Sequence, residues 1–212
     1  VCLSRTGHKP LHLKDEAWSE KIRWCKGDAS NPDEELLQRM DVLICLVGSP
    51  PLPTFSKEAY DQQVFMNGTT NTSVIRKAQD AGMKLSVTAI LGLAGKERSF
   101  EHARATAEWV TELSPEFFSL LTMFHRHNDD FLRSITMQTN GGIIEEALEI
   151  VRHLAPKKTI LRSNHVSNIL NLAGSYPKDR ERIIALAEQA LLQAKLHPAW
   201  FNEVPDYSEE NF

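Results

Sequence analysis

The sequence lacks the features that mark several specialised classes of protein. It has only three cysteines in 212 residues, and no apolar run approaches the roughly 20 residues that a membrane-spanning helix needs. Acidic residues outnumber basic ones by 28 to 24, so no strong positive charge predicts a nucleic-acid partner. A hydrophobic fraction of 42% is ordinary for a globular chain that buries its own core. We therefore expect a globular protein that binds neither nucleic acid nor the membrane interior.

The cysteines and the first residues give further expectations. Cys2, Cys25 and Cys45 are too widely spaced for a known metal-binding pattern. Each lies in an apolar, strand-like segment, which favours buried thiols in a reducing compartment, the cytoplasm or an organelle matrix. The chain opens at Val1 with a strand-like segment, with no initiator Met and no signal peptide, as a fragment or trimmed chain would.

Short apolar segments alternate with longer amphipathic ones along the chain. This alternation is typical of an α/β fold with a mostly parallel sheet and helices on both faces. The expected strands are 1–4, 21–25, 41–47, 84–93, 117–124 and 158–162. The expected helices are one that begins at Asn31, with Asn31 as its cap and Pro32 at its first position, and then 57–81, 100–113, 142–154 and 179–194.

Three strand ends in the first half carry groups that suit a nucleotide. Ligands of open parallel sheets bind beyond the carboxyl ends of the strands. The first expected strand ends in Ser4 and Arg5, a hydroxyl and a planar cation that suit a ribose 2′-phosphate. Asp28 could accept from an adenine amino group, and Gly48 after Val47 would let a ligand approach the backbone. Taken singly, Arg5 also fits a solvated loop and Asp28 a turn.

Taken together, residues 1–82 resemble atypical short-chain dehydrogenase/reductases, a group of NAD(P)-binding proteins related to the accessory subunit of respiratory complex I. Asn67-Gly-Thr-Thr-Asn71 and Ala78-Gln-Asp-Ala-Gly82 add to the resemblance. In that family a Gly-rich phosphate loop precedes the strand found here at 1–4, and a Tyr-x-x-x-Lys pair, absent from this sequence, is usual. The resemblance implies an NADP site lined by Ser4, Arg5, Asp28, Val47 and Gly48.

A different pattern begins after Gly82. The expected strand 84–93 contains Ile90 and Gly92 and leads to Glu97, and glycines at a strand end fit either a tight turn or a close ligand. Further on come Arg162-Ser-Asn-His-Val-Ser-Asn168 and Gly174-Ser-Tyr-Pro-Lys-Asp-Arg-Glu181. With these segments, residues 83–212 resemble the C-terminal half of a radical SAM enzyme barrel.

That second resemblance implies a cofactor pair, S-adenosylmethionine and a [4Fe–4S] cluster. Ile90, Gly92 and Glu97 would contact the adenine and methionine parts of S-adenosylmethionine, and residues 162–165 would lie at the mouth of the last strand. The family holds its cluster with Cys-x-x-x-Cys-x-x-Cys, and no segment of this sequence contains that motif.

Other polar clusters have simpler interpretations. Residues 125–130, His-Arg-His-Asn-Asp-Asp, could ligate a metal, although a solvated loop is favoured. His165 fits a hydrogen-bonded structural histidine or a ligand-facing one. Glu145, Glu146 and Glu149 are expected on a solvated helix face.

The sequence thus predicts a hybrid of two parts, a Rossmann-like part at 1–82 and a half (β/α) barrel at 83–212. The helix–strand alternation continues across the join, which is compatible with one continuous domain. The expected function is at most residual binding of an NADP-type nucleotide, a small-molecule partner, without a complete active site. The alternatives are a radical SAM enzyme whose cluster-binding segment is upstream or missing, and a non-enzymatic scaffold. Substrate and oligomeric state stay open.

Overall fold

The computed structural model describes residues 2–4, 7–9, 11, 14–28, 31–40, 68–123 and 132–205. The chain divides into two compact units, Val1–Leu85 (unit 1) and Ser86–Phe212 (unit 2). Several expected features lie outside the described residues: the strand 41–47, the first part of the helix 57–81, the cluster 125–130, and the candidate site residues Arg5, Val47 and Gly48.

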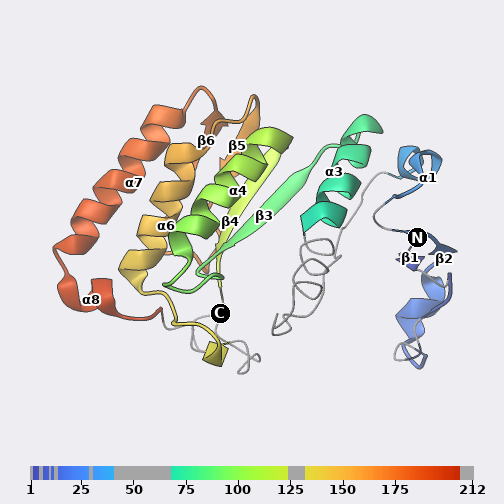
Figure 1. The fold of residues 1–212 in the computed structure, drawn as a ribbon, viewed down its shortest axis with the longest axis horizontal. Coiled ribbons are helices and arrows are strands. Elements are labelled where there is room, and N and C mark those ends of the chain that lie inside the picture. Colours follow the sequence, from blue (N-terminus) through green and yellow to red (C-terminus); the bar gives the residue numbers. More distant parts are fainter. Residues whose placement is uncertain are drawn as a thin grey trace. The chain divides into compact units, whose positions relative to one another are not determined.

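Unit 1 contains a parallel pair of short strands, β1 (Cys2–Ser4) and β2 (Trp24–Lys26). A 3-10 helix, η2 (Ala17–Lys21), lies between them in the sequence, and two helices follow, α1 (Glu34–Gln38) and α3 (Thr70–Asp80) (Figure 1). The prediction that Asn31 caps this helix is wrong. Asp33 caps α1 instead, and its side chain accepts a hydrogen bond from the Glu35 N–H at 2.9 Å. Pro32 therefore stands just before the cap rather than at the first helical position.

Helices α1 and α3 pack against each other through a small apolar contact. Leu37 of α1 and Val74 and Ala78 of α3 are buried. The predicted end of α3 at Gly82 is confirmed, because Gly82 has a φ of +81° and Met83 donates back to the Ala78 carbonyl at 3.0 Å.

Unit 2 is built on a four-stranded sheet in the order β3 (Ser86–Leu91), β4 (Phe117–Thr122), β5 (Thr159–Arg162) and β6 (Ala173–Tyr176). Strands β3, β4 and β5 are parallel, as predicted, whereas β6 runs antiparallel to β5. The sequence did not predict β6, since its residues Ala-Gly-Ser-Tyr form no apolar run.

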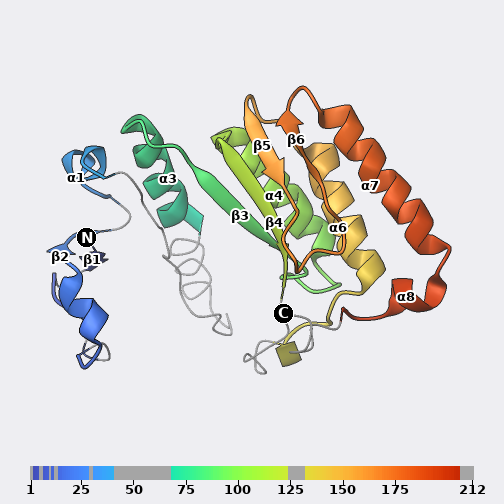
Figure 2. The same ribbon diagram turned by 180° about the vertical axis from the view of Figure 1, so that it is seen from behind.

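The helices of this unit are α4 (Ser99–Leu113), α6 (Asn140–His153), α7 (Arg180–Lys195) and α8 (Pro198–Asn202). In Figures 1 and 2, α4, α6 and α7 cover one face of the sheet. The strands accordingly alternate: Phe118 is buried, whereas Phe117, on the other face, is 41% exposed. The expectation of helices on both faces is therefore not met in the described part of unit 2.

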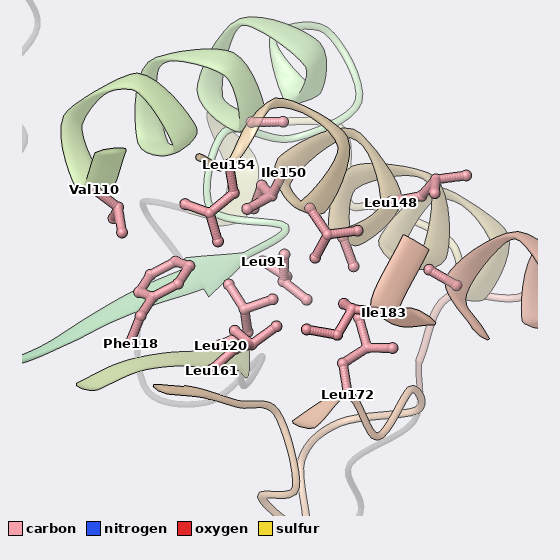
Figure 3. Close-up of a cluster of buried hydrophobic side chains, with 14 of the residues drawn as sticks. Leu91, Val110, Phe118, Leu120, Leu148, Ile150, Leu154, Leu161, Leu172 and Ile183 are labelled. Carbon is pink, nitrogen blue, oxygen red and sulfur yellow. The ribbon is translucent and has the colours of Figure 1, made fainter. Parts of the chain in front are cut away.

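The covered face and the helices share one apolar core (Figure 3). Leu91, Phe118 and Leu161 come from three strands and meet Val110 of α4 and Ile150 of α6. Each such side chain contributes about 1.5–3 kcal/mol on burial, so this core fixes the strand ends and loops above it. Among the described helices, none is long and apolar enough to cross a membrane.

Candidate functional site

The first candidate site lies at the carboxyl ends of β1 and β2. Because these strands are parallel and Ser4 pairs with Lys26, both segments leave the sheet at the same edge. Gly7 turns back over Lys26 with a φ of +75°, and a Cβ at Gly7 would lie 2.9 Å from the Lys26 Cβ, so only glycine fits there. The exposed Asp28 follows two residues after β2. The structure thus places Ser4 and the segment before Asp28 at the same end of the strand pair.

A cavity of about 600 Å³ opens beside β2 and α1. Cys25 and Lys26 of β2 line it, together with Arg23 just before the strand and Gly27 just after it. Cys25 is a free, half-buried thiol, so the expectation of a buried thiol is met only in part. Sequence reasoning missed Arg23 and Lys26, although the period of two along β2 could have placed Arg23 with Cys25 and Gly27 on one side.

Charges of both signs surround this cavity, but they are not equally engaged. Lys77 Nζ donates to Asn31 Oδ1 at 2.6 Å and lies 3.9 Å from Glu34 Oε1. Arg39 lies 3.9 Å from Glu35 Oε2. Within the described ranges, neither Arg23 nor Lys26 forms an ion pair, so these two cations are available to an anionic ligand.

The second candidate site is the loop 92–98 above β3 in unit 2. Gly92 is buried with a φ of +81°, and its N–H donates to Glu146 Oε2 at 3.0 Å. Ser99 Oγ donates to the same oxygen at 3.1 Å, and His102 Nδ1 lies 2.7 Å from Glu146 Oε1. One carboxylate on α6 thereby fastens the start of this loop to the start of α4.

The prediction that Glu145, Glu146 and Glu149 lie on a solvated face of α6 is therefore wrong for two of the three residues. Glu146 is 1% exposed and Glu149 is also buried, with Arg104 Nε 2.8 Å from Glu149 Oε1. Glu145 is partly exposed and lies 3.7 Å from Lys195 Nζ. The reason is that α4 packs along this side of α6 and covers polar positions that would face water on a surface helix.

Glu97 is held at the far end of the same loop. Thr136 Oγ1 donates to Glu97 Oε1, and the Thr136 N–H lies 3.4 Å from Oε2. The hydrogen bond from the Thr136 side chain is the main reason why the pKa of Glu97 is lowered, so this exposed carboxylate stays ionised at neutral pH. Ile90, in contrast, is partly exposed on the sheet face away from the helices, so Ile90 and Gly92 contact different surroundings.

The segment Arg162–Asn168 forms a compact turn fastened to the end of β4. Asn168 Nδ2 donates to the Leu120 carbonyl at 2.7 Å and to Ser163 Oγ at 3.1 Å. Thr122 Oγ1 donates to Asn168 Oδ1 at 3.0 Å. Ser163 and Asn168 thus hold the turn in place, while Arg162 remains exposed.

Within this turn His165 is a hydrogen-bonded residue at the protein surface. Its Nδ1 accepts the Ser167 N–H at 3.1 Å and lies 2.9 Å from Ser167 Oγ. The hydrogen-bonded interpretation is therefore confirmed for Nδ1, and the exposed Asn164 beside it remains open to a ligand.

In the parts of the chain that the structure describes, no three His, Cys, Asp or Glu side chains are grouped to hold a metal ion. Comparison of the chain with protein-family models, with curated proteins and with solved structures finds no match. The resemblances to short-chain dehydrogenase/reductases and to radical SAM enzymes therefore stay predictions.

Proposed function

We propose that the chain is a nucleotide-binding α/β protein with an NADP-type site at the carboxyl ends of β1 and β2. The observation that carries this proposal is the parallel register of the two strands, which pairs Ser4 with Lys26 beside the cavity of unit 1. Ligands of parallel sheets bind at such edges. The proposal covers binding alone and includes no catalytic step.

The charge distribution favours a phosphorylated ligand there. Glu34 and Glu35 each face a nearby cation, Lys77 and Arg39, and Asp33 is engaged in capping α1. Arg23 and Lys26 therefore provide the positive charge that a 2′-phosphate requires. A cavity of about 600 Å³ lies within the usual size range of small-molecule sites and can hold the adenosine part of a dinucleotide.

Calorimetric titration with NADP and NAD tests this proposal. We expect tighter binding of NADP, and Lys26→Ala should weaken NADP binding about tenfold by removing a charge-assisted hydrogen bond. The same variant should leave NAD binding nearly unchanged. Lys158→Ala, an exposed lysine of unit 2, is the matched control for loss of one positive charge.

Two results would contradict the proposal. If neither dinucleotide produced heat, the proposed nucleotide site would be wrong. If the two bound with equal affinity, the proposed contact with the 2′-phosphate would be wrong. Titration with 2′-AMP and 5′-AMP separates these cases, because the smaller probes depend on the adenosine and phosphate contacts only.

A second candidate function is binding of S-adenosylmethionine at the strand ends of unit 2. It is favoured by the loop 92–98, which Glu146 holds at one end and Thr136 at the other. This arrangement presets the ionised Glu97 carboxylate, which could accept from the ammonium group of the ligand. The three clustered thiolates of a [4Fe–4S] site are not in this sequence, so no radical step is included.

Titration with S-adenosylmethionine and S-adenosylhomocysteine tests this candidate, since both carry the same amino group. Glu97→Gln should weaken binding of both about tenfold. Glu101→Gln, an exposed glutamate beside Arg98, is the control. Unchanged affinity in Glu97→Gln would exclude Glu97 as a ligand contact, and Lys26→Ala should not affect this titration.

A further inference from the structure

A smaller cavity, of about 290 Å³, opens where α6 begins. Three segments of unit 2 line it. Lys96 and Phe100 come from near the start of α4, and Phe201 comes from α8; the segment at the start of α6 contributes Gln138, Thr139, Gly142 and Glu145. It lies at the lower end of the size range of ligand pockets, so it suits a small molecule. Neither of the functions proposed above uses this cavity.

Gln138 brings its side-chain amide to the cavity wall. The residue is only 7% exposed, and Oε1 accepts the Thr139 N–H at 3.2 Å. Because Oε1 must be the acceptor of that bond, the orientation of the amide is fixed. No other described residue forms a hydrogen bond with the amide group, so the two Nε2 hydrogens have no partner among the described residues. An acceptor on a ligand in the cavity can pair with these donor hydrogens.

Gly142 provides the space for this amide. A Cβ at Gly142 would lie 2.0 Å from Gln138 Oε1, so no other residue can stand there unless the amide moves. A glycine within a helix destabilises it by roughly 1 kcal/mol relative to alanine. Gly141, the residue before it, has a separate packing reason, because a Cβ there would lie 2.4 Å from the Phe201 ring.

The charges at the cavity select the ligand. Lys96 contributes an ammonium group, and the positive end of the α6 dipole lies at the same place. Glu145 also lines the cavity, but Lys195 lies 3.7 Å from its carboxylate and offsets its charge. With the Glu145 charge offset, Lys96 provides one positive charge, so a ligand with a single negative charge is favoured over a phosphate dianion.

We propose that this cavity binds a small organic carboxylate. The carboxylate oxygens accept from Gln138 Nε2 and from the Lys96 ammonium group, and the apolar body of the ligand packs against Phe100 and Phe201. Phe100 is more than half exposed, so its ring has apolar surface that a ligand can bury. A neutral ligand would not compensate the charge of Lys96.

Benzoate is a suitable probe because it joins one carboxylate to one apolar ring. We expect saturable shifts of the Gln138 side-chain amide resonances when benzoate is added to the ¹⁵N-labelled full chain. Benzamide, a neutral molecule of the same shape, and inorganic phosphate should bind at least about tenfold more weakly. Equal or tighter binding of either would overturn the proposal, as would no saturable shift with benzoate.

Variants identify the contacts. Gln138→Glu keeps the acceptor for Thr139, and an acid is favourable at a helix N-terminus, so the fold is retained while the donor is replaced by a repelling charge. It should abolish benzoate binding, and Lys96→Met should weaken it about tenfold. Gly142→Ala should weaken binding by displacing the amide.

Lys158→Met is the control, and it should leave benzoate affinity unchanged. Benzoate affinity unchanged in both Gln138→Glu and Lys96→Met would overturn the proposal. Melting curves of each variant verify that the chain is folded.

Discussion

The two units differ in what holds the residues at their strand ends in place. In unit 2, a continuous apolar core lies under β3, β4 and β5, and a buried carboxylate, Glu146, fastens the loop above it. In unit 1, few apolar side chains are buried among the residues whose burial the structure describes, and charged residues lie around a cavity. Substitutions in the core of unit 2 should therefore change the free energy of unfolding most, and substitutions at the cavity of unit 1 should change the affinity for the dinucleotide most.

The largest effect that would test this contrast is at Phe118. Its ring is fully buried, and Phe118→Ala should destabilise unit 2 by about 3–5 kcal/mol because it leaves a cavity in the core. Val74→Ala in unit 1 removes less apolar volume and should cost about half as much. Denaturant unfolding followed by circular dichroism measures both.

Phe117→Ala is the matched control within the same strand. Phe117 is half-exposed on the other sheet face, so its loss should cost less than about 1 kcal/mol. If the two phenylalanine variants unfolded at the same denaturant concentration, the assignment of the core to one face of the sheet would be wrong.

A smaller effect is expected at Glu146. Glu146→Gln leaves the groups of Gly92, Ser99 and His102 with one acceptor fewer in a buried place, which should cost roughly 2 kcal/mol. Glu145→Gln, one residue earlier and partly exposed, should cost a few tenths of a kcal/mol. Thermal melting of the two variants makes this comparison, and equal losses would contradict the fastening role of Glu146.

Two glycines with the same φ of +81° compare the units directly. Gly92→Ala in unit 2 adds a Cβ that would lie 3.0 Å from Ile143 Cδ1, whereas the same change at Gly82 in unit 1 meets nothing within 4 Å. Both variants carry the left-handed backbone penalty of about 1–2 kcal/mol, and Gly92→Ala should lose slightly more. A Gly82→Ala variant less stable than Gly92→Ala would show that packing at Gly92 is loose.

The smallest effect is a dependence on alkaline pH. Burial of the ring raises the pKa of Tyr176 to about 12, because desolvation disfavours the phenolate. A raised pKa means that the contribution to stability is fully present below about pH 10, the value for the unfolded chain, and is lost as pH rises toward 12. Unfolding of unit 2 should therefore become easier between these values.

Tyr176→Phe removes the ionising group and should flatten that part of the pH profile. It also removes the hydrogen bond from Tyr176 Oη to the Val151 carbonyl, so its stability at neutral pH should fall by about 1 kcal/mol or less. A variant profile as steep as that of the parent would assign the effect to another group.

Much of unit 2 could be predicted from the sequence. Strands β3, β4 and β5 and helices α4, α6 and α7 lie where the apolar periodicity places them. Strand β6 was missed because its stability comes from pairing with β5 and not from its own residues. The sequence did not predict that helices cover only one face of this sheet. Apolar residues such as Ile90 and Phe117 also occur on the outer face, so the strands have the pattern of strands that are buried on both faces.

For the candidate sites, the sequence predicts which strand ends carry them but not the contacts that their side chains make. Parallel strand ends located Ser4 and the loop after β3, since that rule depends on topology alone. Glu146 was assigned to solvent because its burial depends on how α4 packs across α6, which periodicity does not contain. The pair Gly141 and Gly142 is a signal in the sequence of close packing at the start of α6.

The turn after β5 limits how this protein can be re-engineered. Asn168 and Ser167 of this turn form hydrogen bonds with Leu120 and Thr122, which lie more than forty positions earlier in the chain. A circular permutation or domain fusion opened inside that turn would release the end of β4 as well. New termini are better tolerated between Lys157 and Lys158, which are exposed and precede the strand.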